Sequence, residues 1–180
     1  NLENYNESLN QFCEELPPNS EVLELACGPG NITQYLFNQR PDLKILATDF
    51  AEEMLKIAKR ENPSIETMEL DLLELEKVDS KFDGIICGFG LPYISKEEAI
   101  DFIQVAKTKL HSGGVLYLST MEDFYANSSV EKGMNYYFHE KEYLLKAMEK
   151  AGFEIRLCKN QEFKENDYEY KDLILIGRLG

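Results

Sequence analysis

The feature that most constrains the fold of this chain is an apolar segment that leads directly into a glycine-rich turn and then into a helix. Residues 22–26 (VLELA) predict a short buried strand, and residues 32–38 predict a helix. In the turn between them, Gly28 and Gly30 let the backbone adopt positive φ and approach a ligand closely. Many ordinary turns from a strand to a helix also need a glycine, so this turn alone is weak evidence for a ligand site.

The rest of the chain alternates short apolar segments with amphipathic helical segments. Strands joined by helical crossovers form a mainly parallel sheet with helices on both faces. We therefore predict a single doubly wound, Rossmann-like α/β domain over residues 1–180, with a seven-stranded sheet. The expected strands are residues 22–26, 44–49, 65–70, 82–87, 115–120, 153–158 and 173–177, and the expected helices are one within residues 1–20 and those at 32–38, 54–58, 95–110 and 140–151.

The last two expected strands have no helix between them. Residues 159–167, which join them, are polar and too short for a helical crossover. We therefore expect these two strands to form an antiparallel C-terminal hairpin at the end of the sheet.

Composition and charge narrow the function classes. The formal net charge is -14 and the pI is near 4.6, which opposes the attraction that supplies most nonspecific affinity for nucleic acids. No apolar run approaches the roughly 20 residues of a membrane-spanning helix. The four cysteines are far apart, which argues against a zinc knuckle or a disulfide framework. These features predict a cytoplasmic protein that binds neither nucleic acid nor membrane.

Residues 24–30 (ELACGPG) resemble motif I of the class I S-adenosylmethionine-dependent methyltransferases of the small-molecule type, with an acidic residue, a small residue, cysteine and Gly-x-Gly. The segment departs from the motif only at Ala26, where glycine is commoner; alanine is tolerated there if its backbone faces the cofactor. The resemblance extends over residues 21–180 and implies S-adenosylmethionine as cofactor, with S-adenosylhomocysteine as its product. The cofactor-binding residues predicted on this basis are Glu24, Ala26, Cys27, Gly28, Gly30, Asn31, Asp49, Phe50, Met54, Asp71, Leu72, Gly88 and Phe89.

Dinucleotide binding is the main rival interpretation of the turn. Asp49 follows the glycines by about 20 residues, a spacing that also fits the ribose-binding carboxylate of NAD enzymes. The full pattern G-x-G-x-x-G fails, because Thr33 occupies the position of the third glycine. A carboxylate at Glu24 would repel a pyrophosphate but attract the ammonium and sulfonium groups of S-adenosylmethionine. The resemblance implies that Asp49 binds the ribose hydroxyls; a cap of the following helix is its structural alternative.

Four further residues are assigned to the adenine end of the cofactor. Phe50 and Met54 are expected to flank the ring, with a place in the helical core as the alternative for Met54. The resemblance implies that Asp71 binds the adenine amino group while the backbone amide of Leu72 meets the ring. A solvated turn carboxylate is the alternative for Asp71.

Residues 82–94 resemble the family's motif IV, in which the fourth strand delivers a loop to the methyl donor. Asp83 lies at the amino end of this strand and is expected to be structural, whereas Gly88 and Phe89 lie at the carboxyl end and are site candidates. The segment Leu91-Pro92-Tyr93 lacks the polar first residue with which amino-methylating enzymes of nucleic acids bond the target amine. That function is therefore discounted.

Residues 121–139 are the expected substrate lid. The segment is rich in aromatic residues, which could equally cover an exposed edge of the core. If the acceptor must lose a proton, His139 and Tyr125 are the candidates for the general base. A plain helix-start residue is the alternative for His139.

Methyl transfer from a sulfonium is an in-line displacement with an already activated donor, so an enzyme chiefly supplies alignment and desolvation. No grouping of His, Asp and Glu at metal-ligand spacing occurs, which fits a metal-independent transferase. We predict an enzyme that methylates a small-molecule acceptor. An NAD(P)-dependent oxidoreductase of Rossmann type and a non-catalytic S-adenosylmethionine-binding protein are the alternatives. The acceptor, the atom methylated and the oligomeric state stay open.

Overall fold

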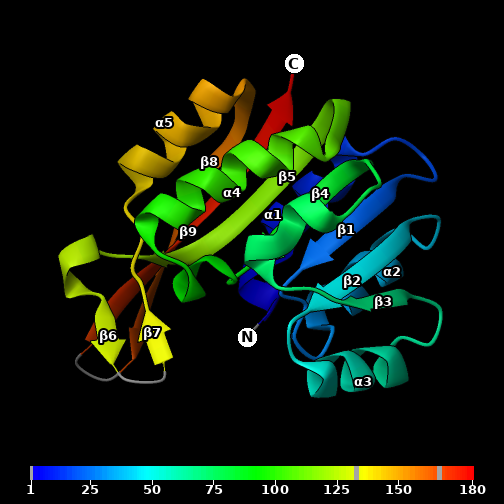
Figure 1. Cartoon of the computed structure of the whole chain (residues 1–180), viewed down its shortest axis with the longest axis horizontal. Helices are drawn as coiled ribbons and strands as arrows, with labels where there is room; N and C mark the ends of the chain where they lie inside the picture. Colours follow the sequence, from blue (N-terminus) through cyan, green and yellow to red (C-terminus); the bar gives the residue numbers. More distant parts are fainter. Residues whose placement is uncertain (1, 132–133, 166–167) are drawn as a thin grey trace.

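A computed structural model of the chain describes residues 2–131, 134–165 and 168–180. A seven-stranded sheet of order β3-β2-β1-β4-β5-β9-β8 runs through it (Figure 1). Strands β1 to β5 are parallel, whereas β9 is antiparallel to β5 and β8 is antiparallel to β9. The expected mainly parallel sheet with an antiparallel C-terminal hairpin is thus confirmed. The strands are β1 (Glu21–Leu25), β2 (Lys44–Asp49), β3 (Glu66–Glu69), β4 (Phe82–Gly88), β5 (Leu110–Glu122), β8 (Phe153–Glu165) and β9 (Tyr168–Leu179).

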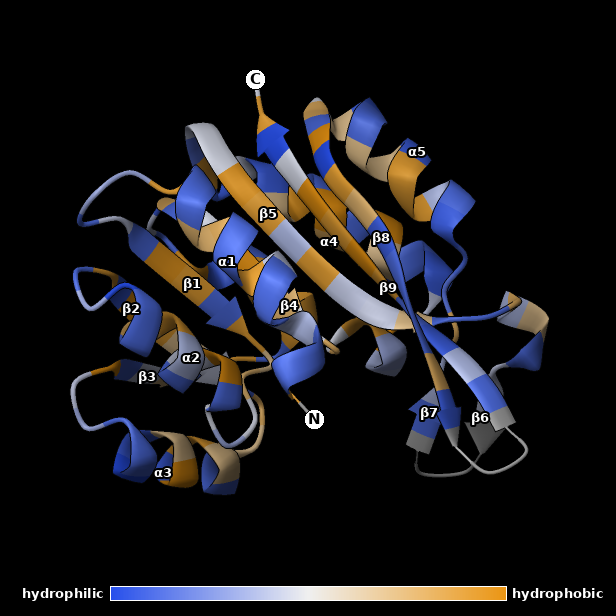
Figure 2. Cartoon of the chain, turned by 180° about the vertical axis from the view of Figure 1, so that it is seen from behind, coloured by the Kyte–Doolittle hydropathy of each residue, from blue (hydrophilic) through white to orange (hydrophobic). Residues whose placement is uncertain are grey.

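Helices cover both faces of the sheet (Figures 1 and 2). Three of them, α1 to α3, pack on one face around one apolar cluster, and α4 and α5 pack on the other around a second. Val22 and Leu23 of β1 point into opposite clusters, as expected of a parallel strand buried on both faces. Among the described residues, no helix has the length and apolar character needed to cross a membrane. The α-helices are α1 (Asn6–Glu15), α2 (Asn31–Gln39), α3 (Glu52–Glu61), α4 (Lys96–Thr108) and α5 (Lys141–Ala151), and the 3₁₀ helices are η1 (Leu2–Tyr5), η2 (Leu72–Lys77), η3 (Leu91–Tyr93) and η4 (Tyr125–Asn127).

Local signals in the sequence set the ends of α4 and α5. The Glu98 backbone N–H donates to the Ser95 hydroxyl oxygen at 3.3 Å, and the Ser95 N–H donates to the Glu98 carboxylate at 2.7 Å. This reciprocal capping box starts α4. Gly152 ends α5 in the left-handed conformation, with a φ of 97°.

The C-terminal hairpin is longer than predicted. The expectation that residues 159–167 form only a connection is wrong, because residues 159–165 continue β8; residues 166–167 lie outside the described part of the chain. The added length carries the hairpin well past the end of β5, toward the lid segment (Figure 1).

Cross-strand pairs explain why so polar a segment forms strands. Phe163 stacks on Tyr170, with ring centroids 5.1 Å apart. Lys164 pairs with Glu169 at 3.1 Å. Such pairs stabilise an antiparallel ladder even where little side-chain area is buried in the core.

The expected lid, residues 121–139, contains η4 and a small antiparallel sheet. The Tyr137 N–H donates to the carbonyl of Pro92 at 2.8 Å, and the rings of Tyr93 and Tyr136 meet edge to face at 6.3 Å. These contacts attach the segment to η3. Its closure over a substrate stays a prediction, and residues 132–133 lie outside the described ranges. The two strands of the small sheet are β6 (Ser129–Glu131) and β7 (Met134–Tyr136).

Phe12 anchors α1 to the sheet, so we expect its truncation to destabilise the fold. Its side chain is fully buried, and its ring meets that of Tyr117 on β5 with centroids 5.9 Å apart. Phe12→Ala is expected to lower the free energy of unfolding by about 3–5 kcal/mol. Glu14→Ala, at an exposed position of the same helix, should change it by less than about 0.5 kcal/mol. Urea unfolding measures both values, and equal effects would contradict the proposed anchoring.

Candidate functional site

A cavity of about 400 Å³ lies at the carboxyl ends of β1, β4 and β5, where the sheet order reverses between β1 and β4. Open α/β sheets bind their ligands at this kind of point, and the volume falls within the range of about 300–1,000 Å³ usual for ligand pockets. The start of the described chain lies over this edge (Figure 1). We call this space the turn cavity; its lining residues are Leu2, Tyr5, Leu9, Ala26, Cys27, Gly28, Pro29, Asn31, Ile32, Gly88, Phe89, Tyr117 and Ser119.

The glycine turn borders this cavity with left-handed backbone. Ala26, Gly28 and Gly30 have φ values of 52°, 53° and 85°. A Cβ placed on Gly28 would meet no atom within 4 Å, whereas a Cβ on Gly30 would lie 2.9 Å from the Asn62 side chain and 3.1 Å from that of Ala58. Gly28 therefore leaves space beside the turn, and Gly30 lets α2 approach α3 closely.

The carboxylate of Asp49 joins the ends of β1 and β2. One oxygen accepts a hydrogen bond from the Gly28 N–H at 2.9 Å, and the other accepts one from the Ala51 N–H at 2.9 Å. The side chain is buried and does not itself line the turn cavity. Asp49 thus holds the turn and also binds the backbone at the start of α3. Its contact with a ribose stays a prediction.

Glu24 is buried beside the turn, with 1% of its surface exposed. One carboxyl oxygen accepts a hydrogen bond from the Thr33 hydroxyl at 2.5 Å, and the other has no hydrogen-bond partner among the described residues. Burial raises the pKa of Glu24 to about 7. The carboxyl group thus lies in the interior beside the turn, and its interaction with a cofactor stays a prediction.

Gly88 and Phe89 form the β4 side of the turn cavity, and their contact with a cofactor stays a prediction. A Cβ on Gly88 would lie only 2.3 Å from Cδ1 of Ile32, so glycine is needed for α2 to approach β4. Phe89 has a φ of 59°, and its N–H donates to the carbonyl of Ser119 at 3.0 Å. This left-handed backbone turns the loop away from the strand direction.

Tyr5 is a site residue that the sequence analysis did not identify. It lines the turn cavity from η1, and its ring meets that of Phe89 edge to face at 5.4 Å. Its hydroxyl donates to the buried carboxylate of Asp172 on β9. Burial raises the pKa of Asp172 above its usual value. In the sequence, Tyr5 only marks the packing face of the N-terminal helix.

The residues predicted for adenine lie outside the turn cavity, next to the ends of β2 and β3. The side chains of Phe50 and Met54 are 73% and 38% exposed. Asp71 accepts a hydrogen bond from the Leu73 N–H at 2.9 Å and so caps η2. Leu72 packs against the apolar cluster beneath α4 and α5. Their contacts with a cofactor stay predictions.

The structure argues against His139 as a general base. The imidazole is fully buried, and burial lowers its pKa, so the ring is neutral at pH 7. Nε2 lies 2.8 Å from the carbonyl oxygen of Leu91 and must donate to it, which leaves Nδ1 to accept from the Tyr143 hydroxyl. No lone pair of His139 is free to receive a proton from a substrate.

The structure also gives Tyr125 a structural position. Its hydroxyl oxygen accepts a hydrogen bond from the Lys96 N–H at 3.3 Å, and its ring stacks on that of Tyr137 at 5.8 Å. Tyr125 lines neither the turn cavity nor the groove described next. This placement does not support the predicted catalytic role.

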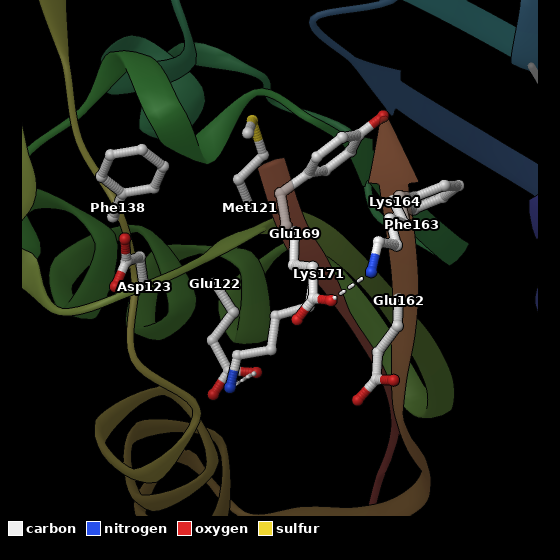
Figure 3. Close-up of a pocket in the computed structure, with 10 residues that line it drawn as sticks. Met121, Glu122, Asp123, Phe138, Glu162, Phe163, Lys164, Glu169 and Lys171 are labelled. Atoms are coloured by element: carbon white, nitrogen blue, oxygen red, sulfur yellow. Dashed lines mark hydrogen bonds and ion pairs between the residues drawn. The ribbon is translucent and has the colours of Figure 1, made fainter. Parts of the chain in front are cut away.

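A second hollow of about 560 Å³ lies between the lid segment and residues 162–164 and 169–171 of the β8–β9 hairpin (Figure 3). Tyr5 stands next to it, because the Tyr5 ring centroid is 6.3 Å from that of Phe163 in its wall. Tyr5 thus contacts the walls of both hollows. We call the second one the lid–hairpin groove; its lining residues are Met121, Glu122, Asp123, Phe138, Glu162, Phe163, Lys164, Glu169, Tyr170 and Lys171.

Comparison with known proteins identifies the family of this chain. A family model described as a methyltransferase domain matches residues 22–114, which is just over half of the chain and includes the glycine turn, Asp49, Asp71 and Phe89. The chain therefore belongs to the methyltransferase domain family. The resemblance to class I S-adenosylmethionine-dependent methyltransferases is confirmed.

Individual proteins are similar to this chain in sequence or in fold. A trans-aconitate 2-methyltransferase of Variovorax paradoxus (strain S110) is 33% identical over 101 residues, which cover 56% of this chain and 38% of that enzyme. The chain thus spans well under half the length of this curated relative. Among solved structures, the chain is similar to an S-adenosylmethionine-dependent methyltransferase from Clostridium acetobutylicum ATCC 824. The match covers 100% of this chain and 92% of the Clostridium chain, with a TM-score of 0.77 and 16% identity. A second similar structure is that of magnesium protoporphyrin IX methyltransferase from Synechocystis PCC 6803, solved with bound S-adenosylmethionine. The match covers 98% of this chain and 80% of that enzyme's chain, with a TM-score of 0.73 and 19% identity.

The buried carboxyl group of Glu24 should make stability depend on pH. Its pKa rises from 4.5 to about 7 on folding, so the folded state favours the protonated form. The resulting stabilisation is fully present below the unfolded pKa and is lost as the pH rises through about 7. The total loss is about 3 kcal/mol.

Glu24→Gln removes this titration and keeps an oxygen that can accept the Thr33 hydroxyl bond. Urea unfolding at a series of pH values measures the free energy of unfolding. Its decrease between pH 4 and 8 should be about 3 kcal/mol smaller in the variant than in the wild type. Two parallel pH profiles would show that Glu24 has no raised pKa.

Proposed function

We propose that this chain binds S-adenosylmethionine in the turn cavity and transfers its methyl group to a small-molecule acceptor. The observation that carries the proposal is the left-handed glycine turn, which leaves open space at Gly28 where the sheet order reverses. Membership of the methyltransferase domain family supports the same chemistry. S-adenosylhomocysteine is then the second product.

Asp49 is the proposed partner of the ribose. Its oxygens hold two backbone N–H groups at 2.9 Å, and each oxygen keeps a further lone pair that can accept a hydroxyl hydrogen bond. In this arrangement Phe50 and Met54 flank the adenine. Asp71 and the amide of Leu72 bind its polar edge.

Glu24 is proposed to act through its charge, without direct contact. Its carboxyl group lies in the interior beside the turn, where weak screening strengthens its attraction for a cation. A sulfonium and an ammonium near the turn would in turn lower the raised pKa of Glu24. Ligand binding and deprotonation of Glu24 then favour each other.

When bound, S-adenosylmethionine supplies a methyl group on a cationic sulfur that an acceptor's lone pair displaces in line. The chain's own contribution is to align the two reactants and to exclude water. Leu2, Tyr5 and Leu9 form one apolar wall of the turn cavity and Phe89 forms part of another. Within the described ranges, no three His, Cys, Asp or Glu side chains form a group that could hold a metal ion, and the proposed displacement needs none.

The acceptor is proposed to enter beneath residues 121–139, which serve as its lid. With His139 and Tyr125 in structural positions, an acceptor that must lose a proton releases it to water. The net charge of -14 favours a small molecule over a nucleic acid as the acceptor. The cysteines at 13, 27, 87 and 158 are free thiols, which supports a reducing, cytoplasmic location.

Cofactor binding is tested with two glycines that share a backbone conformation. Gly28 and Gly113 have φ values of 53° and 77°, and a Cβ on either would meet no atom closer than 3.9 Å. Only Gly28 borders the turn cavity. Gly28→Leu is expected to weaken S-adenosylmethionine binding by at least about tenfold, or 1.4 kcal/mol. Gly113→Leu carries the same backbone strain and should bind like the wild type; isothermal titration calorimetry measures both.

The same titrations distinguish the alternative functions. Wild-type protein that binds NAD but not S-adenosylmethionine would overturn the proposal in favour of an oxidoreductase. Binding of S-adenosylmethionine without formation of S-adenosylhomocysteine across a broad acceptor panel would instead indicate a non-catalytic binding protein.

A further inference from the structure

The lid–hairpin groove has aromatic walls. On its hairpin side, the rings of Phe163 and Tyr170 stack with centroids 5.1 Å apart and planes 16° apart. On its lid side, Phe138 lies across from Phe163 and Met121 stands between them (Figure 3). Flat rings of this kind bind apolar bodies, and their faces also attract cations.

The groove also carries an excess of negative charge. Four acidic and two basic side chains line it. Each lysine is paired within the groove, Lys171 with Glu122 at 3.6 Å and Lys164 with Glu169 at 3.1 Å (Figure 3). The remaining carboxylates, those of Asp123 and Glu162, have no cationic partner among the described residues.

These two remaining carboxylates differ in their local roles. Asp123 accepts hydrogen bonds from the Phe124 N–H at 2.7 Å and from the Asn127 amide at 3.0 Å, so it stabilises the start of η4. Glu162 is exposed and makes no hydrogen bond or ion pair within the described ranges. Glu162 lies opposite Lys171 in the register of the hairpin, but the ion pair of Lys171 is with Glu122. The charge of Glu162 can therefore be removed without loss of a hydrogen bond or ion pair.

The groove adjoins the turn cavity through Tyr5. The Tyr5 ring contacts Phe89 of the turn cavity at 5.4 Å and lies 6.3 Å from Phe163 of the groove. Its hydroxyl is held by Asp172, which is paired in the sheet with Met121 in the groove wall. A molecule in the groove therefore lies one side chain away from the proposed methyl donor.

We propose that the lid–hairpin groove is the acceptor site and that it takes an organic cation with an aromatic or aliphatic body. The positive charge lies on one group of this acceptor, and the methyl group is received by a separate heteroatom that carries a free lone pair, with S-adenosylhomocysteine as the leaving group. The proposal rests on the methyl transfer proposed above. The carboxylates of Asp123 and Glu162 attract the cation, the aromatic faces bind both the charge and the apolar body, and the body is removed from water. An anionic acceptor would meet uncompensated like charge and be rejected.

Three probes of one shape test the charge preference: 3-phenylpropylamine, 3-phenylpropan-1-ol and 3-phenylpropanoate, which are cationic, neutral and anionic near neutral pH. Each is titrated calorimetrically into the protein in the presence of S-adenosylhomocysteine. The amine is expected to bind about tenfold or more tightly than the carboxylate, with the alcohol between them. Equal or tighter binding of the carboxylate, or no binding of the amine, would overturn the proposal.

Variants locate the binding. Glu162→Gln should weaken amine binding about two- to fivefold and leave alcohol binding unchanged. Glu66→Gln makes the same charge change at an exposed position on β3 and should leave both unchanged. Tyr170→Ala should weaken amine and alcohol alike, since it removes an aromatic wall. Identical amine affinities in the wild type and Glu162→Gln would place the amine elsewhere and overturn the proposal.

Titration with S-adenosylmethionine alone separates this proposal from the one it rests on. A protein that binds S-adenosylmethionine but shows no preference for the amine retains the proposed methyl transfer and loses only the acceptor class. A protein that binds no S-adenosylmethionine loses the methyl transfer, and with it the assignment of the groove as an acceptor site, even where the amine binds there.

Discussion

Three hydrogen bonds between the ends of β1 and β2 hold the site together. The Cys27 N–H donates to the carbonyl of Thr48 at 2.9 Å, the Thr48 hydroxyl donates to the carbonyl of Glu24 at 3.0 Å, and the Gly28 N–H donates to Asp49 at 2.9 Å. They stabilise a turn in which Ala26, Gly28 and Gly30 have left-handed backbone, which is costly for the alanine. The space beside Gly28 exists because this turn directs the chain away from the strand before α2 begins.

The position of Glu24 is unfavourable for the empty fold. A buried carboxyl group with one unpaired oxygen costs free energy, and its raised pKa expresses this cost. Hydrophobic side chains fill the neighbouring positions of β1, so an apolar residue would suit the core better. A carboxylate at this place is reasonable if its charge acts on a cationic ligand at the adjacent turn. The free energy of unfolding is then lower in the protein without ligand and rises when the cationic ligand binds.

Local patterns explain which parts of the structure were predictable. The glycine turn and Asp49 follow from spacing along the chain, and the alternation of strands and helices gave the sheet. Tyr5 was missed because its partner, Asp172, is 167 positions away. Residues 159–165 appeared to be a loop because their stabilising contacts are across the hairpin. The sequence left His139 open between a general base and a helix-start residue, because only the packing shows that both ring nitrogens are already bonded.

The segment that covers the turn cavity is held less firmly than the helix that follows it. No residue of η1 is buried. The Tyr5 side chain is held by one hydrogen bond and two aromatic contacts, and its carbonyl accepts a hydrogen bond from the Ser8 hydroxyl at 2.9 Å. In α1, by contrast, Leu9 and Phe12 are completely buried. Segments with few buried contacts open at lower free energy than the core beneath them. The cover can therefore open while α1 stays in place, and this opening would also separate Tyr5 from the lid–hairpin groove. The ring of Tyr5 therefore links the walls of the two hollows through its contacts with Phe89 and Phe163.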